Sequence, residues 1–321
     1  YFMNMYAAAS NLHLKPIIIY AGNREYNKLP YGIYSSDVFY EPLLYFPGIK
    51  KYYSLRDDHR IGLPPLEYIN TNAVQYIAKA NSFNFNQAYF KGFKIEAPYY
   101  KESIDSTSII IQFDLNNSKT NATFFSKQTG YFTTNSQGGV SLLDKVQQDE
   151  NLSKKLSYHL KDFTIENKEF INAKTDVYNY LPLYSKCTAT SESFLTENGT
   201  IYIAPIGNLT GEQTQLPILD PSKRVNPVSI NFPKKYIKTI IINIPDGYLV
   251  DNLSQFNRNV GVDTICKFES RAVLTEQTLT ISIEEWYTKC HFPKEAFSPI
   301  YKTYKEAVDF YNLNLVLIKD E

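Results

Sequence analysis

The sequence predicts an α+β protein in which a small mixed unit precedes a mainly antiparallel β-sandwich that ends with a helix. The first observation is a helix-forming run that leads into a buried strand and two further strands. The second is a series of eight or more short strand-like runs separated by turn residues, which is typical of a β-sandwich. The third is a helical face near the end of the chain, formed by Ile300, Tyr304, Ala307, Val308 and Tyr311. At about Ala97 the sequence changes from a mixed helix and strand pattern to successive strand-like runs. We therefore expect two domains, residues 1–96 and 97–321.

The first unit is predicted from helix-forming and helix-ending residues. Ala7-Ala8-Ala9 favours a helix, Pro16 ends it, and the Gly in residues 47–49 indicates a hairpin turn. The predicted elements are a helix over residues 1–11, a buried strand over 14–20, a loop over 21–37, and two strands over 38–46 and 50–55.

The second unit is predicted to consist of strands with one long interruption. Residues 120–134 predict a pair of strands, and residues 138–160 predict an amphipathic helix that is interrupted near Glu150-Asn151. A closing helix and a last strand are expected at 299–312 and 315–319. The remaining predicted strands are 108–115, 163–170, 176–190, 199–206, 238–245, 247–253, 264–274 and 279–288.

The charge balance excludes some classes of partner. Lys and Arg number 33 and Asp and Glu number 33, so the formal net charge is zero. A general nucleic-acid or membrane-surface binder needs a surplus of positive charge, and we therefore expect neither partner. No run approaches the roughly 20 apolar residues that a membrane span requires. No signal peptide is visible in this chain.

Cysteine and histidine do not form a metal-binding pattern. Only Cys290 and His291 are adjacent, and neighbouring residues on a strand point to opposite faces. We therefore expect no metal and no cofactor. Cys266 and Cys290 fall on two strand-like runs joined by residues 275–278, where a cross-strand disulfide and two ordinary thiols both remain open.

Two further patterns have a plain structural interpretation and a functional one. Asp57-Asp58 precedes His59 and Arg60, which invites an acid/base role, but we prefer a solvated turn before Gly62. The aromatic clusters suit stacking on sugars or peptides, although core packing explains them as well in a Tyr-rich β-protein. These clusters are Tyr52-Tyr53, Tyr99-Tyr100 and the run from Tyr178 to Tyr184.

The C-terminal part of the sequence resembles a known type of domain. The matching segments are 199–206, 220–233, 242–255 and 298–319, and the resemblance covers roughly Asp105 to Glu321. They resemble the β-domain, of obscure role, that follows transglutaminase-like cores in many envelope proteins of Bacteroidota. Ser254 departs from the pattern, because the family often has Pro there.

The N-terminal quarter resembles the second half of the transglutaminase-like core itself, an α+β fold of the papain-like type. Residues 12–24 are similar to the junction of the nucleophile-bearing helix with a buried strand, and Ile61–Pro65 is similar to a turn of the core. The family's chemistry uses a Cys thiolate beside a His, with an Asp that orients the imidazole. The resemblance therefore implies a Cys, His and Asp at defined places.

This sequence lacks two of those residues where the resemblance expects them. The nucleophile would lie about one helical turn before Tyr1. The His would fall near residues 39–41, where Tyr40 and Glu41 stand, and the Asp near Ser54. Asp57 substitutes for the Asp only with a shift of register. His13 and His59 are the remaining candidates, and neither is placed by the family pattern.

Three functional hypotheses follow. The first is a non-catalytic cell-envelope protein, periplasmic or associated with the outer membrane, that binds other envelope proteins, a glycan or a peptide. The second is an active cysteine-dependent transglutaminase, amidase or peptidase whose nucleophile lies before this chain, with His13 or His59 as its base. The third is a structural or assembly subunit of a larger envelope complex. The missing His and Asp argue against the second, and the sequence barely separates the first from the third.

Overall fold

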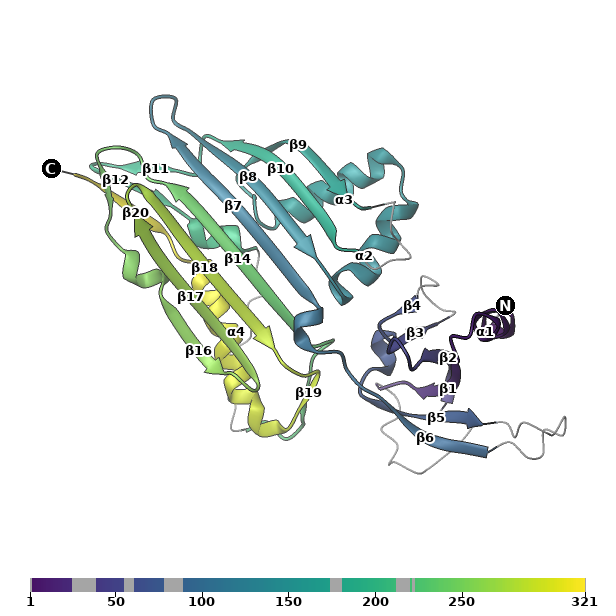
Figure 1. Ribbon diagram of the computed structural model, residues 1–321. Helices are drawn as coiled ribbons and strands as arrows, with labels where there is room; N and C mark the ends of the chain where they lie inside the picture. Colours follow the sequence, from purple (N-terminus) through teal and green to yellow (C-terminus); the bar gives the residue numbers. More distant parts are fainter. Residues whose placement is uncertain are drawn as a thin grey trace. The chain divides into compact units, whose positions relative to one another are not determined.

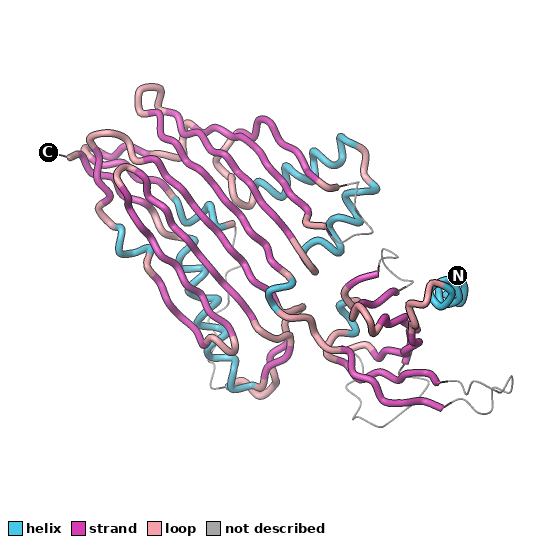
Figure 2. Tube along the Cα trace, in the orientation of Figure 1, coloured by secondary structure: helices cyan, strands magenta, loops and turns pink. Residues whose placement is uncertain are grey.

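The computed structural model describes residues 2–24, 39–54, 61–77, 89–173, 181–211, 220 and 223–320. Strands dominate the trace, and the fold is α+β with mostly antiparallel sheets (Figure 2). Two compact units are present. One is built mainly from residues up to Pro98, together with Ile230–Phe232, and the other mainly from Tyr99 onward.

The first unit is an antiparallel sheet with a helix on one face (Figure 1). Ala9 of the helix packs with Leu44, Phe46 and Tyr53 on one side of the sheet. The described strands follow the order β4-β3-β2-β1-β5-β6. The helix, the buried strand and the hairpin at residues 47–49 confirm the prediction. The elements are α1 (Phe2–Asn11), β1 (Ile17–Gly22), β2 (Phe39–Phe46), β3 (Lys51–Tyr53), β4 (Ile61–Gly62), β5 (Thr71–Ile77) and β6 (Tyr89–Ile95).

The second unit is organised around a long sheet whose described strands follow the order β16-β17-β18-β14-β7-β8-β10-β9. All neighbouring pairs are antiparallel except β14 and β7, which are parallel. The strands are β7 (Ile104–Asp114), β8 (Lys119–Gln128), β9 (Thr164–Ile171), β10 (Leu183–Ser191), β14 (Lys234–Asn243), β16 (Arg258–Val262), β17 (Cys266–Thr275) and β18 (Thr278–Tyr287).

One face of this sheet, which we call the inner face, is covered by a smaller sheet and by helices. Leu317 of the small sheet, Phe310 of α4 (Phe297–Tyr311) and Leu156 of α3 (Lys145–Ser157) share one core with the long sheet. Helix α4 lies behind β17 and β18 in Figure 1. This β-on-β arrangement with a closing helix confirms the predicted sandwich. The small sheet has the order β11-β12-β20-β15, and two short strands, β13 and β19, pair separately. Their bounds are β11 (Thr196–Asn198), β12 (Ile201–Ala204), β13 (Val228–Ser229), β15 (Tyr248–Val250), β19 (His291–Phe292) and β20 (Leu315–Lys319).

The second half of one predicted strand pair is wrong. Strand β8 ends at Gln128, and residues from Tyr131 form helix α2 (Tyr131–Leu142) instead. Gly130 has φ of 58°, which lets the chain turn sharply there. The hydroxyls of Thr133 and Thr134 then donate to the carbonyl of Gly130 and support the first helical turn.

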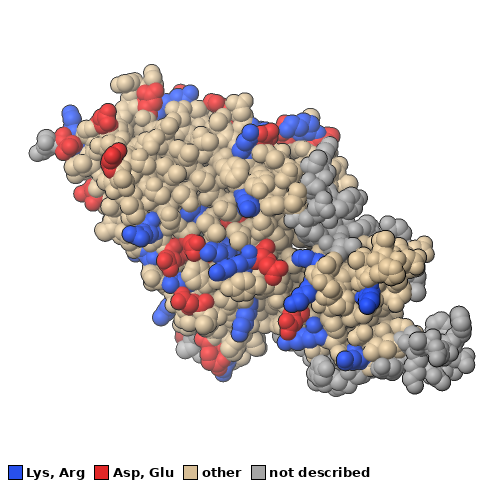
Figure 3. All heavy atoms as spheres, in the orientation of Figure 1, with Lys and Arg blue, Asp and Glu red and all other residues tan. Residues whose placement is uncertain are grey.

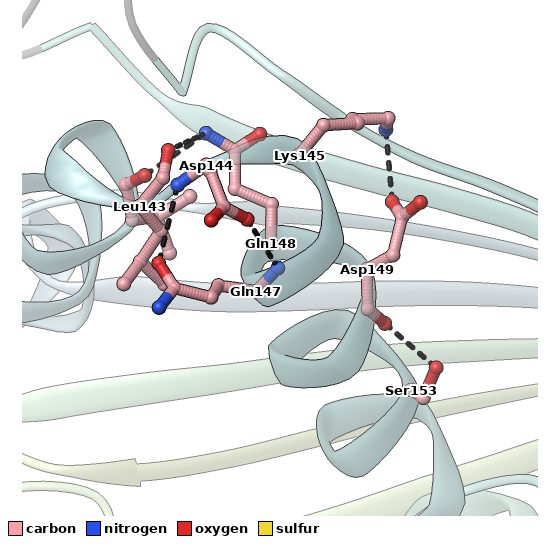
Figure 4. Close-up of polar contacts among 8 residues, drawn as sticks. Leu143, Asp144, Lys145, Gln147, Gln148, Asp149 and Ser153 are labelled. Atoms are coloured by element: carbon pink, nitrogen blue, oxygen red, sulfur yellow. Dashed lines mark hydrogen bonds and ion pairs between the residues drawn. The ribbon is translucent and has the colours of Figure 1, made fainter.

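The predicted helix break near Glu150-Asn151 is also misplaced. The break lies at Leu143 and Asp144, between α2 and α3 (Figure 4). Asp144 Oδ1 accepts from the backbone N–H of Gln147 at 2.9 Å, and the Gln147 side chain accepts from the N–H of Asp144 at 3.3 Å. This capping box begins a new helix, which the apolar spacing alone does not reveal.

Candidate functional site

The expected catalytic positions of the first unit form a buried hydrogen-bond network. The register that pairs Leu44 with Tyr53 puts Glu41 and Ser54 on the same face of β2 and β3. Ser54 Oγ donates to Glu41 Oε1 at 2.8 Å, and Tyr68 OH donates to Glu41 Oε2 at 2.6 Å. Glu41 is 7% exposed. The structure thus brings two of the predicted positions together, and adds Tyr68, which the sequence did not indicate.

Among the described residues, this network does not contain the groups of a thiol-dependent site. The hydroxyls of Ser54 and Tyr68 both donate to the carboxyl oxygens of Glu41. His13 is exposed in the turn after α1. Asp57 and His59 lie outside the described residues, as does the side chain of Tyr40. Among the described groups, the network holds a carboxylate in place and supplies no imidazole base.

The three cysteines all lie in the second unit, and all are buried thiols that form no disulfide. Cys266 stands opposite Tyr287 in the predicted hairpin, so the disulfide alternative with Cys290 is wrong. Burial raises the pKa of Cys187 to about 12 and also raises the pKa of Cys266. A buried, protonated thiol is a poor nucleophile, so Cys187 and Cys266 are not placed for catalysis.

A second polar cluster occupies one end of the inner face of the long sheet. Glu285 accepts from Tyr287 OH at 2.8 Å, and burial raises the pKa of Glu285. Lys238 donates to the carbonyl of Thr210, and burial lowers its pKa. Burial, aided by the Lys238 charge, lowers the pKa of His159 to about 4. The sequence signal for this cluster is the spacing of Lys238, which lies two and four positions before the core residues Ile240 and Ile242 of β14. Alternate residues of a strand share a face, so the spacing puts Lys238 on the core side.

The opposite, outer face of the long sheet carries an open groove where β9 and β10 pair irregularly. The groove has a volume of about 490 Å³ and is lined by Thr123, Asn167, Lys168, Glu169, Lys186 and Thr188, with Cys187 in the strand between the last two. Lys186 and Glu169 form an ion pair across it. Figure 3 views this face of the sheet, and much of the surface over β7, β8 and β14 is uncharged.

The predicted aromatic clusters have different outcomes. Tyr52 and Tyr53 are buried and belong to the core, as their structural interpretation expects. Tyr100 stacks 6.5 Å from Trp286 between ring centroids, and the ammonium of Lys235 lies 5.7 Å from the Trp286 ring. Of the third cluster, residues 178–180 lie outside the described part, while Tyr184 packs on the outer face 5.7 Å from Phe125, between ring centroids.

The fold defines the second unit as a β-sandwich with flanking helices. Residues 199–317 match the model of a family described as a domain of unknown function with solved structure, DUF3858. The match extends from the turn before β12 into β20, covers less than half of the chain, and does not include the groove. No curated protein matches the sequence. Within the described ranges, none of the helices has the length and apolar character needed to span a membrane.

Proposed function

We propose that this protein is a non-catalytic cell-envelope protein, with a degenerate transglutaminase-like core, that acts by binding a protein or a glycan. It works as a subunit of a larger envelope assembly. The observation that carries the proposal is the network of Glu41, Ser54 and Tyr68. Glu41 and Ser54 stand at the places that the family resemblance assigns to the catalytic His and Asp.

The chemistry of those positions supports binding rather than turnover. Thiol catalysis needs a base that takes a proton from Cys and later returns it to the leaving group, and a third group that orients the base. A serine hydroxyl does not replace the Asp, because it carries no negative charge to stabilise an imidazolium. The glutamate side chain is committed to Ser54 and Tyr68 within the core.

The buried polar cluster of the second unit is better explained by structure than by catalysis. Its charged groups are tied to the backbone and to one another, as in the bonds from Lys238 to Thr210 and from Tyr287 to Glu285. Strongly shifted pKa values often mark functional sites, but structural networks shift them too. The groove of the outer face is, by contrast, open and accessible to a ligand.

The proposal is tested by assaying the full-length gene product for release of ammonia from a glutaminyl peptide and for hydrolysis of peptide amides. We expect no turnover above a heat-inactivated control. Turnover that iodoacetamide blocks, and that His59→Ala or His13→Ala abolishes, would show instead a cysteine-dependent enzyme. Assembly is tested by affinity purification from envelope extracts. A strictly monomeric protein that retains no extract component would contradict the proposed role in a complex.

A further inference from the structure

We propose that the groove on the outer face, beside the β9–β10 irregularity, binds a neutral oligosaccharide. This inference rests on the proposed binding function and gives it a site and a ligand class. The groove lies in residues 123–188, outside the stretch that matches the family model. It is therefore a feature of this chain that the family match does not describe.

A β-bulge makes the groove. Cys187 pairs with Lys168 and Ala189 with Ile165, so that the two residues Glu166 and Asn167 lie opposite the single residue Thr188. A bulge of this kind re-aims side chains that would otherwise alternate between the two faces. The hydroxyl of Thr190 donates to Glu166 at 3.2 Å, and Asn167 Nδ2 donates to Thr188 Oγ1 at 3.4 Å. Two successive polar side chains therefore reach the outer face together.

The size and polarity of the groove suit a hydroxyl-rich ligand. Its volume of about 490 Å³ falls within the usual range for small-molecule sites. The side chains of Thr123, Thr188 and Asn167 offer both donors and acceptors, which match sugar hydroxyls. Lys186 and Glu169 cancel within one ion pair, and Lys168, which also lines the groove, is offset by Glu166 at the same bulge, so the region carries no net charge that would favour an anion or a cation.

An aromatic pair beside the groove adds a stacking surface. Phe125 pairs with Lys186 in the register of β8 and β10, so it lies on the same face as the groove. Its ring lies 5.7 Å from that of Tyr184, and Phe125 is 41% exposed. A sugar ring has an apolar face of C–H groups, and this face packs well against the apolar ring of an exposed aromatic side chain. Polar groups and an aromatic surface thus adjoin one another.

A peptide is the less favourable occupant. Peptides commonly bind a sheet by adding a strand to its edge, and β9 is an edge strand among the described residues. This edge carries the bulge and the charged residues Glu166, Lys168 and Glu169. Bulges and charges are the features that prevent strand addition at sheet edges. The observations therefore favour a ligand that sits on the face over one that extends the sheet.

The test is binding of the purified full-length protein to an array that contains neutral oligosaccharides, uronic-acid oligosaccharides and peptides, followed by calorimetry on the best ligand. We expect binding to neutral oligosaccharides. Asn167→Ala and Phe125→Ala should each weaken it about tenfold, since each removes one hydrogen-bonding or stacking contact. The matched controls Thr280→Ala and Val273→Ala, on the outer face but away from the groove, should leave affinity unchanged.

Several outcomes would overturn the inference. These are no binding to any neutral oligosaccharide, tighter binding to peptides or uronic-acid oligosaccharides, or equal effects of the groove and control variants. Circular dichroism of each variant excludes unfolding as the cause of lost binding. If the protein retains an envelope protein but binds no glycan, this inference fails while the proposed binding function stands. If it turns over an amide substrate, the proposed function fails whatever the array shows.

Discussion

Replacing His159 with Asn should remove a pH-dependent loss of stability from the second unit. The residue follows α3, where its Nδ1 lies 3.0 Å from the carbonyl oxygen of Leu209 and its ring packs 5.3 Å from that of Phe124. Burial lowers the pKa of His159 from 6.5 to about 4, and the positive charge of Lys238 contributes. An Asn side chain keeps a donor near the same place and does not titrate in this range.

The magnitude follows from the difference between the folded and unfolded pKa values. A folded pKa of about 4 against an unfolded pKa of 6.5 corresponds to about 3 kcal/mol of stability that depends on the protonation of His159. The unfolded chain takes up the proton at higher pH than the folded one. The stability linked to neutral His159 is therefore fully present above pH 6.5 and is lost as the pH falls to about 4.

The assay is urea unfolding at pH 7 and pH 4, followed by tryptophan fluorescence. Trp286 is the single tryptophan and lies on β18, so the signal reports the second unit. Cavity formation should make His159→Asn less stable than the wild type at pH 7. Between pH 7 and pH 4, however, the variant should lose about 3 kcal/mol less unfolding free energy than the wild type loses. His13→Asn, at an exposed histidine of the first unit, is the control. Equal pH dependence in wild type and His159→Asn would refute the assignment.

Three further predictions concern single features. Tyr68→Phe removes a hydrogen bond to the Glu41 carboxylate and should lower the unfolding free energy of the first unit by about 1.5–3 kcal/mol, measured by hydrogen exchange of β2; unchanged exchange would contradict the network. Asp144→Ala removes the capping box and should cost about 1 kcal/mol, seen as faster exchange in α3 with α4 unaffected. Ellman's reagent should not react with Cys187, Cys266 or Cys290 in the native protein, and it should label all three in denaturant. Rapid labelling of the native protein would contradict their burial.

The regular elements of the fold could be predicted because their side chains alternate with the period of the element. In the hairpin of β17 and β18 buried and mostly apolar residues recur at every second position over most of each strand, and the register follows from a two-residue turn. Helix α2 could not be predicted in this way, because residues 131–134 are aromatic and Thr residues with strand preference. The helix forms because the chain turns at Gly130 and because the hydroxyls of Thr133 and Thr134 donate to the Gly130 carbonyl.

The candidate sites show the same limit. The positions of Glu41 and Ser54 could be named from the family resemblance, but the hydrogen bond from Tyr68 to Glu41 joins residues that are 27 positions apart in the sequence. The groove depends on a bulge, which is a property of how β9 and β10 pair and not of either strand alone. Lys238 does carry a sequence signal, since a lysine in phase with core isoleucines predicts a buried charge.

The central claim, that this protein binds without catalysing, is tested most directly by following the ligand itself. The full-length protein is incubated with fractionated envelope glycans and peptides, and the retained and unretained molecules are analysed by mass spectrometry. We expect retained molecules to keep their original mass after prolonged incubation. Deamidated, cleaved or cross-linked products that form only with the active protein, and disappear when thiols are blocked, would contradict it.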